Sequence, residues 1–251
     1  MRAQILEHIT QLEKDQNITI LLAVESGSRA WGCPSPDSDY DVRIIYKRKA
    51  AEYLEIDDKP DTINYFHGEL LDINGWDIKK TLKLIRKSNA TPYEWAQSPI
   101  KYKVRDNFSA EILELSKMYF QPRHSMNHYK GIAKNSYLSN NLIGEIKLKK
   151  LFYVLRPVMA AKWIIKYKEV PPMDIPKLLP IIADNKVVEH IQKLLVIKES
   201  ANEDYVHKID PLIEDFIKRE LEGLSNTELE DKDDLPATEI LNNKFKEIIG
   251  A

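Results

Sequence analysis

Cysteine is almost absent from this sequence. Cys33 is the only one in 251 residues, so neither an internal disulfide nor a cysteine-based zinc site can form within the chain. Cys33 lies in a polar loop with no histidine beside it to activate the thiol, so its position does not indicate a nucleophile. The sequence therefore excludes a disulfide framework.

A strong net charge and a long hydrophobic run are also missing. The formal charge is −2, so any nucleic-acid site must be a local basic patch. The most apolar long segment, 151–165, is interrupted by Arg156 and Pro157 and is too short to span a bilayer. The first 16 residues form a charged amphipathic pattern rather than a signal sequence. We therefore expect a cytoplasmic protein with no membrane partner.

The composition is that of a globular protein with two modest domains. Hydrophobic residues make up 43% and charged residues 30%. The sequence changes character near residue 105, after which nearly every segment has helical periodicity. We expect an α+β domain over residues 1–105 and a helical domain over 106–251. The second domain should contain an acidic linker at about 224–237 and a terminal helix at about 238–249.

The spacing of apolar residues predicts the individual elements of both domains. Ile5, Ile9 and Leu12 share one helical face, for example, and residues 17–24 form a β-branched and aliphatic run. Helices are expected at 2–15, 77–88 and 107–120, from there through residue 143, at 145–169, and in short pieces between 174 and 221. A helical turn is expected at 28–32, and strands or strand-like pieces at 17–24, 39–49, 52–56, 62–66 and 69–76.

Two aspartates one residue apart are the clearest chemical signal. In a strand, Asp39 and Asp41 project from the same face. At roughly 5 Å and an effective dielectric constant of about 20, their repulsion is on the order of 3 kcal/mol. Carboxylate oxygens suit Mg²⁺ or Mn²⁺, and such an ion offsets the repulsion. The alternative is a solvent-exposed strand end, where water screens the pair and nothing binds.

The residues before this pair favour a binding site. The buried strand runs directly into Gly27 and Ser28, where glycine permits close backbone approach and neighbouring N–H groups can hold a phosphate. The ten residues at 29–38 are enough to bring the next strand back beside the first. The phosphate-binding turn and the carboxylate pair are then expected at adjacent strand ends.

This arrangement resembles the signature of the DNA polymerase β superfamily of nucleotidyltransferases. That signature is a strand, Gly-Gly or Gly-Ser, a gap of roughly ten residues, and Asp-x-Asp or Asp-x-Glu on a second strand, and here it reads GSRAWGCPSPDSDYDV. The resemblance implies a mixed sheet flanked by helices. It also implies that Gly27 and Ser28 bind the β- and γ-phosphates of a nucleoside triphosphate while Asp39 and Asp41 hold metal ions.

Two-metal nucleotidyl transfer also requires a third carboxylate from a later strand. The candidates are Glu69, Asp72 and Asp77. Asp72 lies inside a predicted strand, so its side chain can reach the sheet end where Asp39 and Asp41 project. Asp77 lies at a strand-to-helix junction, where capping the helix is a sufficient explanation. We predict Asp72 as the third carboxylate, with Asp77 as the alternative.

Two further stretches resemble one branch of this superfamily. LLDINGWDIKKTLKLIRKSNATPYEWAQSPIKY and KKLFYVLRPVMAAKWI are similar to the bacterial and phage nucleotidyltransferases that include RNA-repair-associated polymerase-β-like proteins. The similarity covers roughly Ile20 to Pro172. The chain has Asn89-Ala90 where that family commonly has Asn-Pro. The resemblance implies a nucleotidyltransferase domain followed by a helical domain, and it leaves the acceptor open.

Several cationic residues are further candidates for binding phosphate. Lys149, Tyr153 and Arg156 share one face of a predicted helix and could bind a phosphate and stack on a base. A core tyrosine with charges at its rim is the alternative. Arg29 could meet a phosphate or pair with Glu25. Lys80, Lys83 and Lys87 could bind a triphosphate or a nucleic-acid backbone, and His124 and His128 could bind zinc. For both groups, the alternative is that they lie on the solvent-exposed face of a helix.

The predicted function is therefore metal-dependent transfer of a nucleoside monophosphate from a nucleoside triphosphate to an acceptor hydroxyl, with release of pyrophosphate. An RNA end is one candidate acceptor, and a small molecule or a protein is another. The alternative from a different class is a catalytically weak nucleotide-binding or antitoxin-like interaction module. The oligomeric state and base preference are left open by the sequence.

Overall fold

The computed structural model describes residues 1–68, 70–140 and 144–251, and the chain divides into two compact units. The sheet unit comprises Met1–Ala30, Asp39–Tyr119 and Asp233–Ala251. The helical unit comprises Trp31–Ser38 and Phe120–Lys232. Each unit is therefore assembled from segments that are distant in the sequence.

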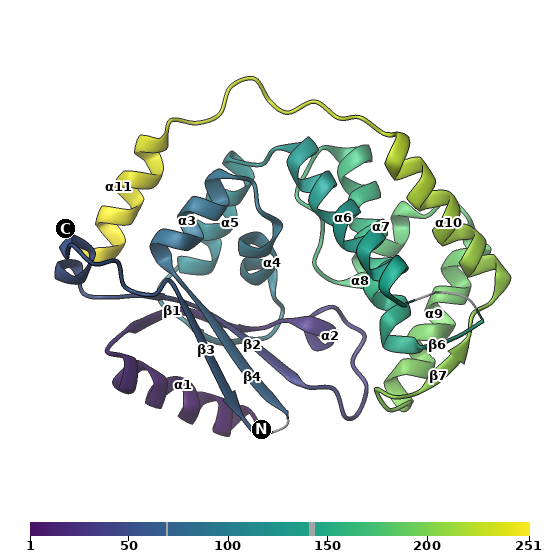
Figure 1. Ribbon diagram of the computed structural model, residues 1–251, viewed down its shortest axis with the longest axis horizontal. Coiled ribbons are helices and arrows are strands. Elements are labelled where there is room, and N and C mark those ends of the chain that lie inside the picture. Colours follow the sequence, from purple (N-terminus) through teal and green to yellow (C-terminus); the bar gives the residue numbers. More distant parts are fainter. Residues whose placement is uncertain (69, 141–143) are drawn as a thin grey trace. The chain divides into compact units, whose positions relative to one another are not determined.

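The sheet unit is built on a mixed five-stranded sheet with the strand order β3-β4-β2-β1-β5 (Figure 1). β2 and β4 are parallel, whereas the other neighbouring strands are antiparallel. The strands are β1 (Thr19–Glu25), β2 (Tyr40–Lys47), β3 (Thr62–His67), β4 (Leu71–Asp77) and β5 (Lys101–Val104). The parallel pair at the centre fixes which ends of β2 and β4 lie together.

Alternating apolar residues bury both faces of this sheet. One face packs on α1 (Arg2–Gln16), whose buried Ile5, Ile9 and Leu12 contact Val42 and Ile44 of β2 in one core cluster. The opposite face packs on α3 (Ile78–Arg86), α4 (Ala90–Gln97), α5 (Phe108–Met118) and α11 (Thr238–Ile249). Figure 1 shows α1 on one side of the sheet and α3, α4 and α5 on the other. A core on each face holds the strands in register.

Two short elements and the terminal helix complete the sheet unit. α2 (Gly27–Ala30) follows β1 directly, and η1 (Ala50–Leu54) is a 3₁₀ turn after β2. α11 returns from the end of the chain and packs beside α3 through Leu241 and Phe245. The last twelve-residue helix is therefore part of the core of the sheet unit.

The helical unit contains a central pair of long helices. These helices are α6 (Pro122–Asn140) and α7 (Leu148–Tyr167), and Tyr129, Phe152 and Leu155 are among their buried residues. The remaining elements are β6 (Glu145–Lys147), α8 (Ile175–Leu178), η2 (Leu179–Ile181), α9 (Asn185–Ser200), β7 (Val206–Lys208) and α10 (Pro211–Asn226). β6 and β7 form a two-stranded antiparallel sheet.

Most elements predicted from the sequence are present. The differences occur where contacts with distant parts of the chain determine the local structure. The strand-like piece predicted at 52–56 is wrong, because this stretch holds the end of the η1 turn and exposed loop. The predicted strand at 69–76 is β4, and Glu69 lies outside the described residues. The helix predicted through residue 143 is α6, and residues 141–143 are likewise outside them. The units divide at Tyr119 rather than at residue 105, because α5 packs on the sheet.

None of the described helices is both long and apolar enough to cross a membrane. The longest apolar helix, α7, carries Arg156 and Lys162 near its centre.

Candidate functional site

Asp41 and Asp72 lie side by side at the same end of the sheet. Asp41 is the second residue of β2, Asp72 is the second residue of β4, and the parallel register pairs them directly. Both side chains are about one-third exposed, at 27% and 31%. The strand interior around them is apolar, with Val42, Ile44 and Ile73 buried. The pairing follows from the parallel strands and puts two carboxylates on one face.

Arg43 connects these two carboxylates. Its Nη2 atom lies 2.9 Å from Oδ1 of Asp41 and 2.9 Å from Oδ2 of Asp72. Arg43 is two residues after Asp41, so strand alternation places it on the same face. The two carboxylates thus already converge on one cation. Sequence reasoning missed Arg43, although its spacing from Asp41 was a usable signal.

Burial raises the pKa of Asp41 above its usual range. The neighbouring carboxylates of Asp72 and Asp39 add to this increase, whereas the guanidinium of Arg43 opposes it. Asp39 itself precedes β2, and its residue is exposed. These opposing effects indicate a site that favours positive charge beside Asp41.

Gly27 brings the backbone against the carboxylate of Asp41. A Cβ atom added at Gly27 would lie 2.0 Å from Oδ2 of Asp41, and the residue has φ of +59°. Both the close approach and the left-handed backbone favour glycine. Ser26 N–H also donates to the backbone carbonyl of Asp41 at 2.8 Å. The Gly-Ser turn and the aspartate strand are therefore adjacent, with Ser28 half-buried in α2.

Glu25 holds the backbone of β2 at Asp41. It is fully buried, and its Oε1 atom accepts a hydrogen bond from Asp41 N–H at 2.8 Å. Tyr102 of β5 donates its hydroxyl hydrogen to the other oxygen. Burial raises the pKa of Glu25, although these two donors oppose the increase. Sequence reasoning considered Glu25 only as a partner of Arg29, although a carboxylate ending an apolar strand was itself a signal.

Arg29 lies on the other side of the turn. Its Nε atom donates to the backbone carbonyl of Asp39 at 3.1 Å, and its guanidinium lies 3.9 Å from the centre of the Tyr40 ring. These contacts tie α2 to the residues that begin β2. Binding of a phosphate by Arg29 stays a prediction.

Asp77 lies at the opposite end of β4 from Asp72. It pairs in register with Tyr46 rather than with Asp41, so about 16 Å of strand separates it from Asp72. Its Oδ1 atom accepts from Lys79 N–H at 2.7 Å and caps α3, and Tyr53 donates to its Oδ2 atom at 2.8 Å. The structure thus gives Asp77 the capping role and brings Asp72, not Asp77, beside Asp41.

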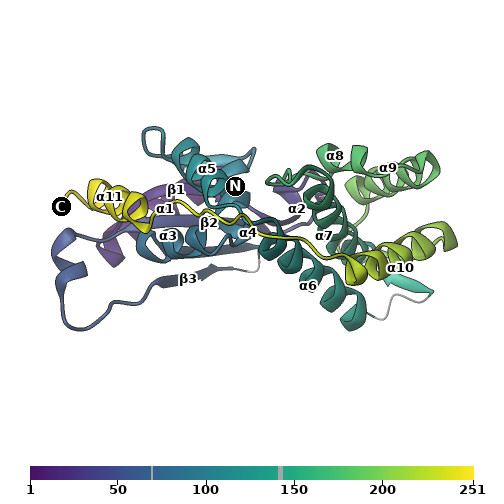
Figure 2. The same cartoon turned by 90° about the horizontal axis from the view of Figure 1, so that it is seen from above.

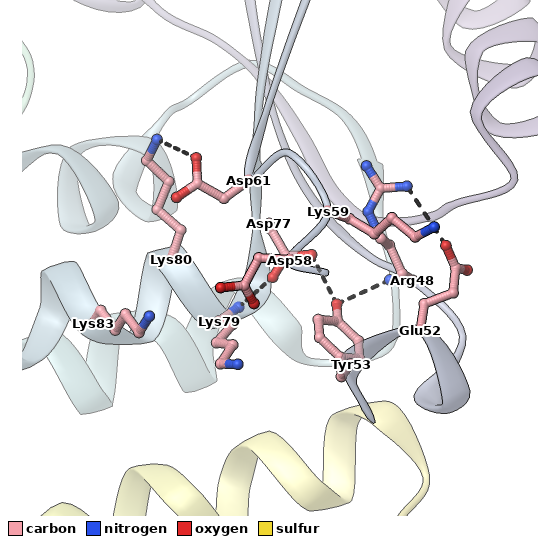
Figure 3. A pocket seen from close by; sticks show the side chains of 10 residues that line it. All are labelled: Arg48, Glu52, Tyr53, Asp58, Lys59, Asp61, Asp77, Lys79, Lys80 and Lys83. Atoms are coloured by element: carbon pink, nitrogen blue, oxygen red, sulfur yellow. Dashed lines mark hydrogen bonds and ion pairs between the residues drawn. The ribbon is translucent and has the colours of Figure 1, made fainter. Parts of the chain in front are cut away.

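A small polar cavity surrounds Asp77 (Figure 3). It has a volume of about 140 Å³. Lys80 pairs with Asp61 there at 2.9 Å, and Arg48 lies 3.9 Å from Glu52. The lining residues carry both signs of charge and are Arg48, Glu52, Tyr53, Asp58, Lys59, Asp61, Asp77, Lys79, Lys80 and Lys83. This mixture does not single out one kind of ligand.

The predicted stripe on α7 belongs to the helical unit, where it contacts the segment Trp31–Ser38. Arg156 is buried, donates from Nε to the Met173 carbonyl at 2.9 Å and lies 4.5 Å from the Trp31 ring centre. Tyr153 packs edge-on against Trp31, and Lys149 lies 3.3 Å from Glu203. These contacts fix Arg156 within the helical unit, and nucleotide binding by Lys149, Tyr153 and Arg156 stays a prediction.

The two predicted histidines lie on α6. Nδ1 of His124 contacts Oδ2 of Asp231 at 2.6 Å, and the ring of His128 packs against Tyr129. Across residues 1–68, 70–140 and 144–251, no three histidine, cysteine, aspartate or glutamate side chains form a group that could hold a metal ion. The described residues therefore provide no third ligand for a zinc ion at this histidine pair.

Comparison with known proteins shows the family. The model of the RNA repair pathway DNA polymerase beta family matches residues 1–247, and the chain belongs to this family. Over 227 residues, it is 39% identical to the uncharacterized protein YcgL of Bacillus subtilis (strain 168), covering 89% of this chain and 86% of that protein. The polymerase-β-like resemblance inferred from the sequence is therefore confirmed, and the protein is a polymerase-β-like nucleotidyltransferase by family.

A solved structure was also matched. A nucleotidyltransferase-like protein from Exiguobacterium sibiricum 255-15 is 10% identical, and the match covers 88% of this chain and 73% of that chain with a TM-score of 0.33.

Proposed function

We propose that the protein transfers a nucleoside monophosphate from a nucleoside triphosphate to an acceptor hydroxyl in a metal-dependent reaction that releases pyrophosphate. The observation that carries this proposal is the pairing of Asp41 with Asp72 beside Gly27. It supplies a carboxylate pair and a backbone turn at one sheet end, as nucleotidyl transfer requires. Membership in a polymerase-β-like family supports the same reaction.

The carboxylates at this sheet end are the kind of ligand that Mg²⁺ or Mn²⁺ binds, and Asp41 and Asp72 supply two of them side by side, although the described residues hold no preformed group of three. Asp39, Asp41 and Asp72 are hard oxygen donors, which these ions prefer. Asp41 and Asp72 already converge on the positive guanidinium of Arg43. Asp41 and Asp72 would hold such an ion through carboxylates that now contact Arg43. When bound, the metal supplies charge neutralisation at the triphosphate and lowers the pKa of the acceptor hydroxyl.

Each residue then has a distinct task. Asp39 and Asp41 would hold the metal ions, and Asp72 would orient the acceptor hydroxyl or take its proton. Gly27 lets the backbone approach the phosphates, and the Ser28 hydroxyl can donate to a phosphate oxygen. Glu25, by accepting from Asp41 N–H, holds the aspartate strand in place.

We further propose that the reaction serves the repair of RNA ends. The family description refers to an RNA repair pathway, and an RNA terminus carries hydroxyl groups that can accept a nucleotide. Transfer to a small hydroxylated molecule or to a protein uses the same site chemistry, so the acceptor must be identified by experiment.

The test is incubation with each NTP labelled at the α-phosphate, Mg²⁺ or Mn²⁺, and a panel of RNA ends, small hydroxylated molecules and the protein itself. We expect label on one class of acceptor, and loss of labelling to background in Asp39→Asn and Asp41→Asn. Asp57→Asn, an exposed carboxylate of the sheet unit, is the matched control and should behave as wild type. Unchanged labelling by Asp41→Asn would contradict the proposal.

A further inference from the structure

Phe66 is a large apolar side chain that stays in solvent. It is 72% exposed and lies in β3, one of the two edge strands of the sheet (Figure 2). An isolated exposed apolar residue is common on protein surfaces and carries no meaning by itself. The position of Phe66 relative to the carboxylates makes it informative.

Strand register puts Phe66 next to Asp72. The antiparallel pairing of β3 and β4 places Phe66 directly opposite Asp72, so the two side chains project from the same face with Cβ atoms roughly 5 Å apart. Asp72 is in turn opposite Asp41 on its other side, and Asp41 touches Gly27. Gly27, Asp41, Asp72 and Phe66 therefore form one row across the sheet end, with Phe66 about 10 Å from Asp41.

The two proposed substrates occupy different ends of this row. The proposed triphosphate lies at the Gly27 end, and the proposed acceptor lies at Asp72. Phe66 is beyond Asp72, so it is on the acceptor side. A benzyl ring offers neither charge nor hydrogen bonds to a phosphate or a metal ion, but its face stacks on a nucleobase.

The same face of β3 continues with polar groups. Asn74 Nδ2 donates to Asn64 Oδ1, one cross-strand pair beyond Phe66 and Asp72. Lys80 Nζ donates to Thr62 Oγ1 at 2.5 Å near the far end of β3 and pairs with Asp61 at 2.9 Å. This face therefore presents an aromatic ring, two amides and an amine in succession. A single-stranded nucleic acid could use the ring for a base and the polar groups for its phosphate backbone.

We propose that the acceptor is the hydroxyl-bearing end of a single-stranded RNA, whose terminal base stacks on Phe66. This inference rests on the proposed function, because it uses Asp72 as the carboxylate nearest the acceptor. It goes beyond that function by naming Phe66 as the residue that recognises the terminal base of the acceptor. A protein or small molecule without a base gains nothing from Phe66.

The test is a double-mutant cycle on the full chain, which combines a substitution of Phe66 with removal of the terminal base of the RNA. Fluorescence anisotropy measures the affinity for a short single-stranded RNA with either an intact or an abasic terminal nucleotide. Phe66→Ala should weaken binding of the intact RNA roughly 5- to 150-fold, as expected for one stacked base. The abasic end should weaken wild-type binding by a similar factor, and Phe66→Ala should lose nothing further on the abasic RNA.

Two variants serve as references. Phe66→Trp should retain the affinity of the wild type, because indole also stacks. Leu138→Ala removes a similarly exposed apolar side chain, 65% exposed on α6, and should leave both affinities unchanged. Equal losses on intact and abasic RNA in Phe66→Ala would overturn the stacking assignment.

Failure of the inference and failure of the proposed function are distinguishable. If nucleotide is transferred to a protein or a small molecule and the Phe66→Ala variant transfers equally well, the acceptor assignment is wrong while nucleotidyl transfer stands. If the double-mutant cycle shows the stacking coupling but no NTP labels any acceptor, RNA recognition stands and the proposed reaction is wrong.

Discussion

At the scale of single residues, Gly27 is a point of close approach between the backbone and the carboxylate of Asp41. Gly27→Ala would place a Cβ atom 2.0 Å from Oδ2 of Asp41 at a φ of +59°. We expect this variant to lose nucleotidyl transfer by at least about tenfold, since a misplacement of about 1 Å has effects of this size or larger. The left-handed backbone should cost about 1 kcal/mol of stability.

The measurement is kcat/KM for nucleotide transfer together with the unfolding temperature. Gly223→Ala is the matched control, because it lies in α10 and an added Cβ meets nothing within 4 Å. That variant should be as stable as the wild type or slightly more stable. Wild-type activity in Gly27→Ala would show that the turn does not need to approach Asp41.

A second prediction at this scale concerns the positive charge of Arg43. Without its guanidinium, Asp41 and Asp72 repel each other, by about 1–3 kcal/mol for two partly exposed carboxylates. Arg43→Gln should therefore unfold at a lower temperature than wild type in EDTA. Saturating Mg²⁺ should raise its unfolding temperature more than that of the wild type, because the ion replaces the missing charge.

Differential scanning fluorimetry with and without Mg²⁺ checks this prediction. Arg219→Gln is the control, since Arg219 is 63% exposed on α10 and should show no change in the response to Mg²⁺. An equal Mg²⁺ shift in Arg43→Gln and the wild type would mean that the ion does not bind between the two aspartates.

The sequence indicated part of this site and missed part. Asp39 and Asp41 could be found because strand alternation and a preceding Gly-Ser turn are local patterns. Arg43 and Glu25 were missed because their roles depend on partners in other strands, namely Asp72 in β4 and Tyr102 in β5. A local pattern shows which face a side chain takes, but not what it meets there.

At the scale of elements, the register of β4 separates the two candidates for the third carboxylate. Asp72 pairs with Asp41, whereas Asp77 caps α3 from the far end of the same strand. We expect Asp72→Asn to abolish nucleotidyl transfer. Asp77→Asn should retain most of it and remain folded, because asparagine is also a good N-cap.

The two variants form a matched pair, since each removes one negative charge from β4. The transfer assay with labelled NTP compares them directly, and circular dichroism checks that both are folded. Retained transfer in Asp72→Asn with loss in Asp77→Asn would reverse the assignment.

Long elements with strong periodicity were predictable, whereas several short strands were not. The helix with Ile5, Ile9 and Leu12 on one face is α1, as expected. β5, with four residues, and the β6–β7 pair, with three residues each, were not predicted. These strands form because a distant partner supplies the hydrogen bonds, as β1 does for β5, and such pairing leaves little trace in the local sequence.

At the scale of the whole molecule, the chain passes between the two units four times, after Ala30, Ser38, Tyr119 and Lys232. The acidic stretch before the last crossing was expected to be a solvated linker. Asp231 is instead fixed to the start of α6, where it accepts from Arg123 N–H and Arg123 Nε, both at 2.9 Å. One charged residue thus anchors an otherwise exposed segment.

This anchor predicts a pH-dependent stability. Burial opposes ionisation of Asp231, but hydrogen bonds from Arg123 and His124 outweigh it and hold its pKa below the usual range. A carboxyl group with a lowered folded-state pKa stabilises the fold above its unfolded pKa, and this contribution is lost as the pH falls through the folded value. Asp231→Asn should therefore be less stable at pH 7 by about 1 kcal/mol, or roughly 2–4 °C.

Thermal unfolding at several pH values measures the difference. The gap between wild type and Asp231→Asn should shrink as the pH falls below about 4. Asp234→Asn, an exposed neighbour, should match the wild type throughout. A gap that is independent of pH would assign the effect to packing rather than to charge.

The division into units could be predicted only in outline. The sequence predicted the change from strands to helices, but the boundary followed contacts that no local pattern contains. α5 and α11 are helical segments that pack on the sheet, and Trp31–Ser38 groups with the helical unit. There, Ser35 accepts from the buried Lys198 at 2.9 Å.

The central claim is that this chain transfers the nucleotide and releases pyrophosphate. The most direct measurement uses two preparations of the same NTP, one labelled at the α-phosphate and one at the γ-phosphate, with Mg²⁺ and the acceptor found in the panel. We predict that the α-label appears on the acceptor and the γ-label appears in pyrophosphate. Appearance of the γ-label on the acceptor or in orthophosphate would contradict nucleotidyl transfer.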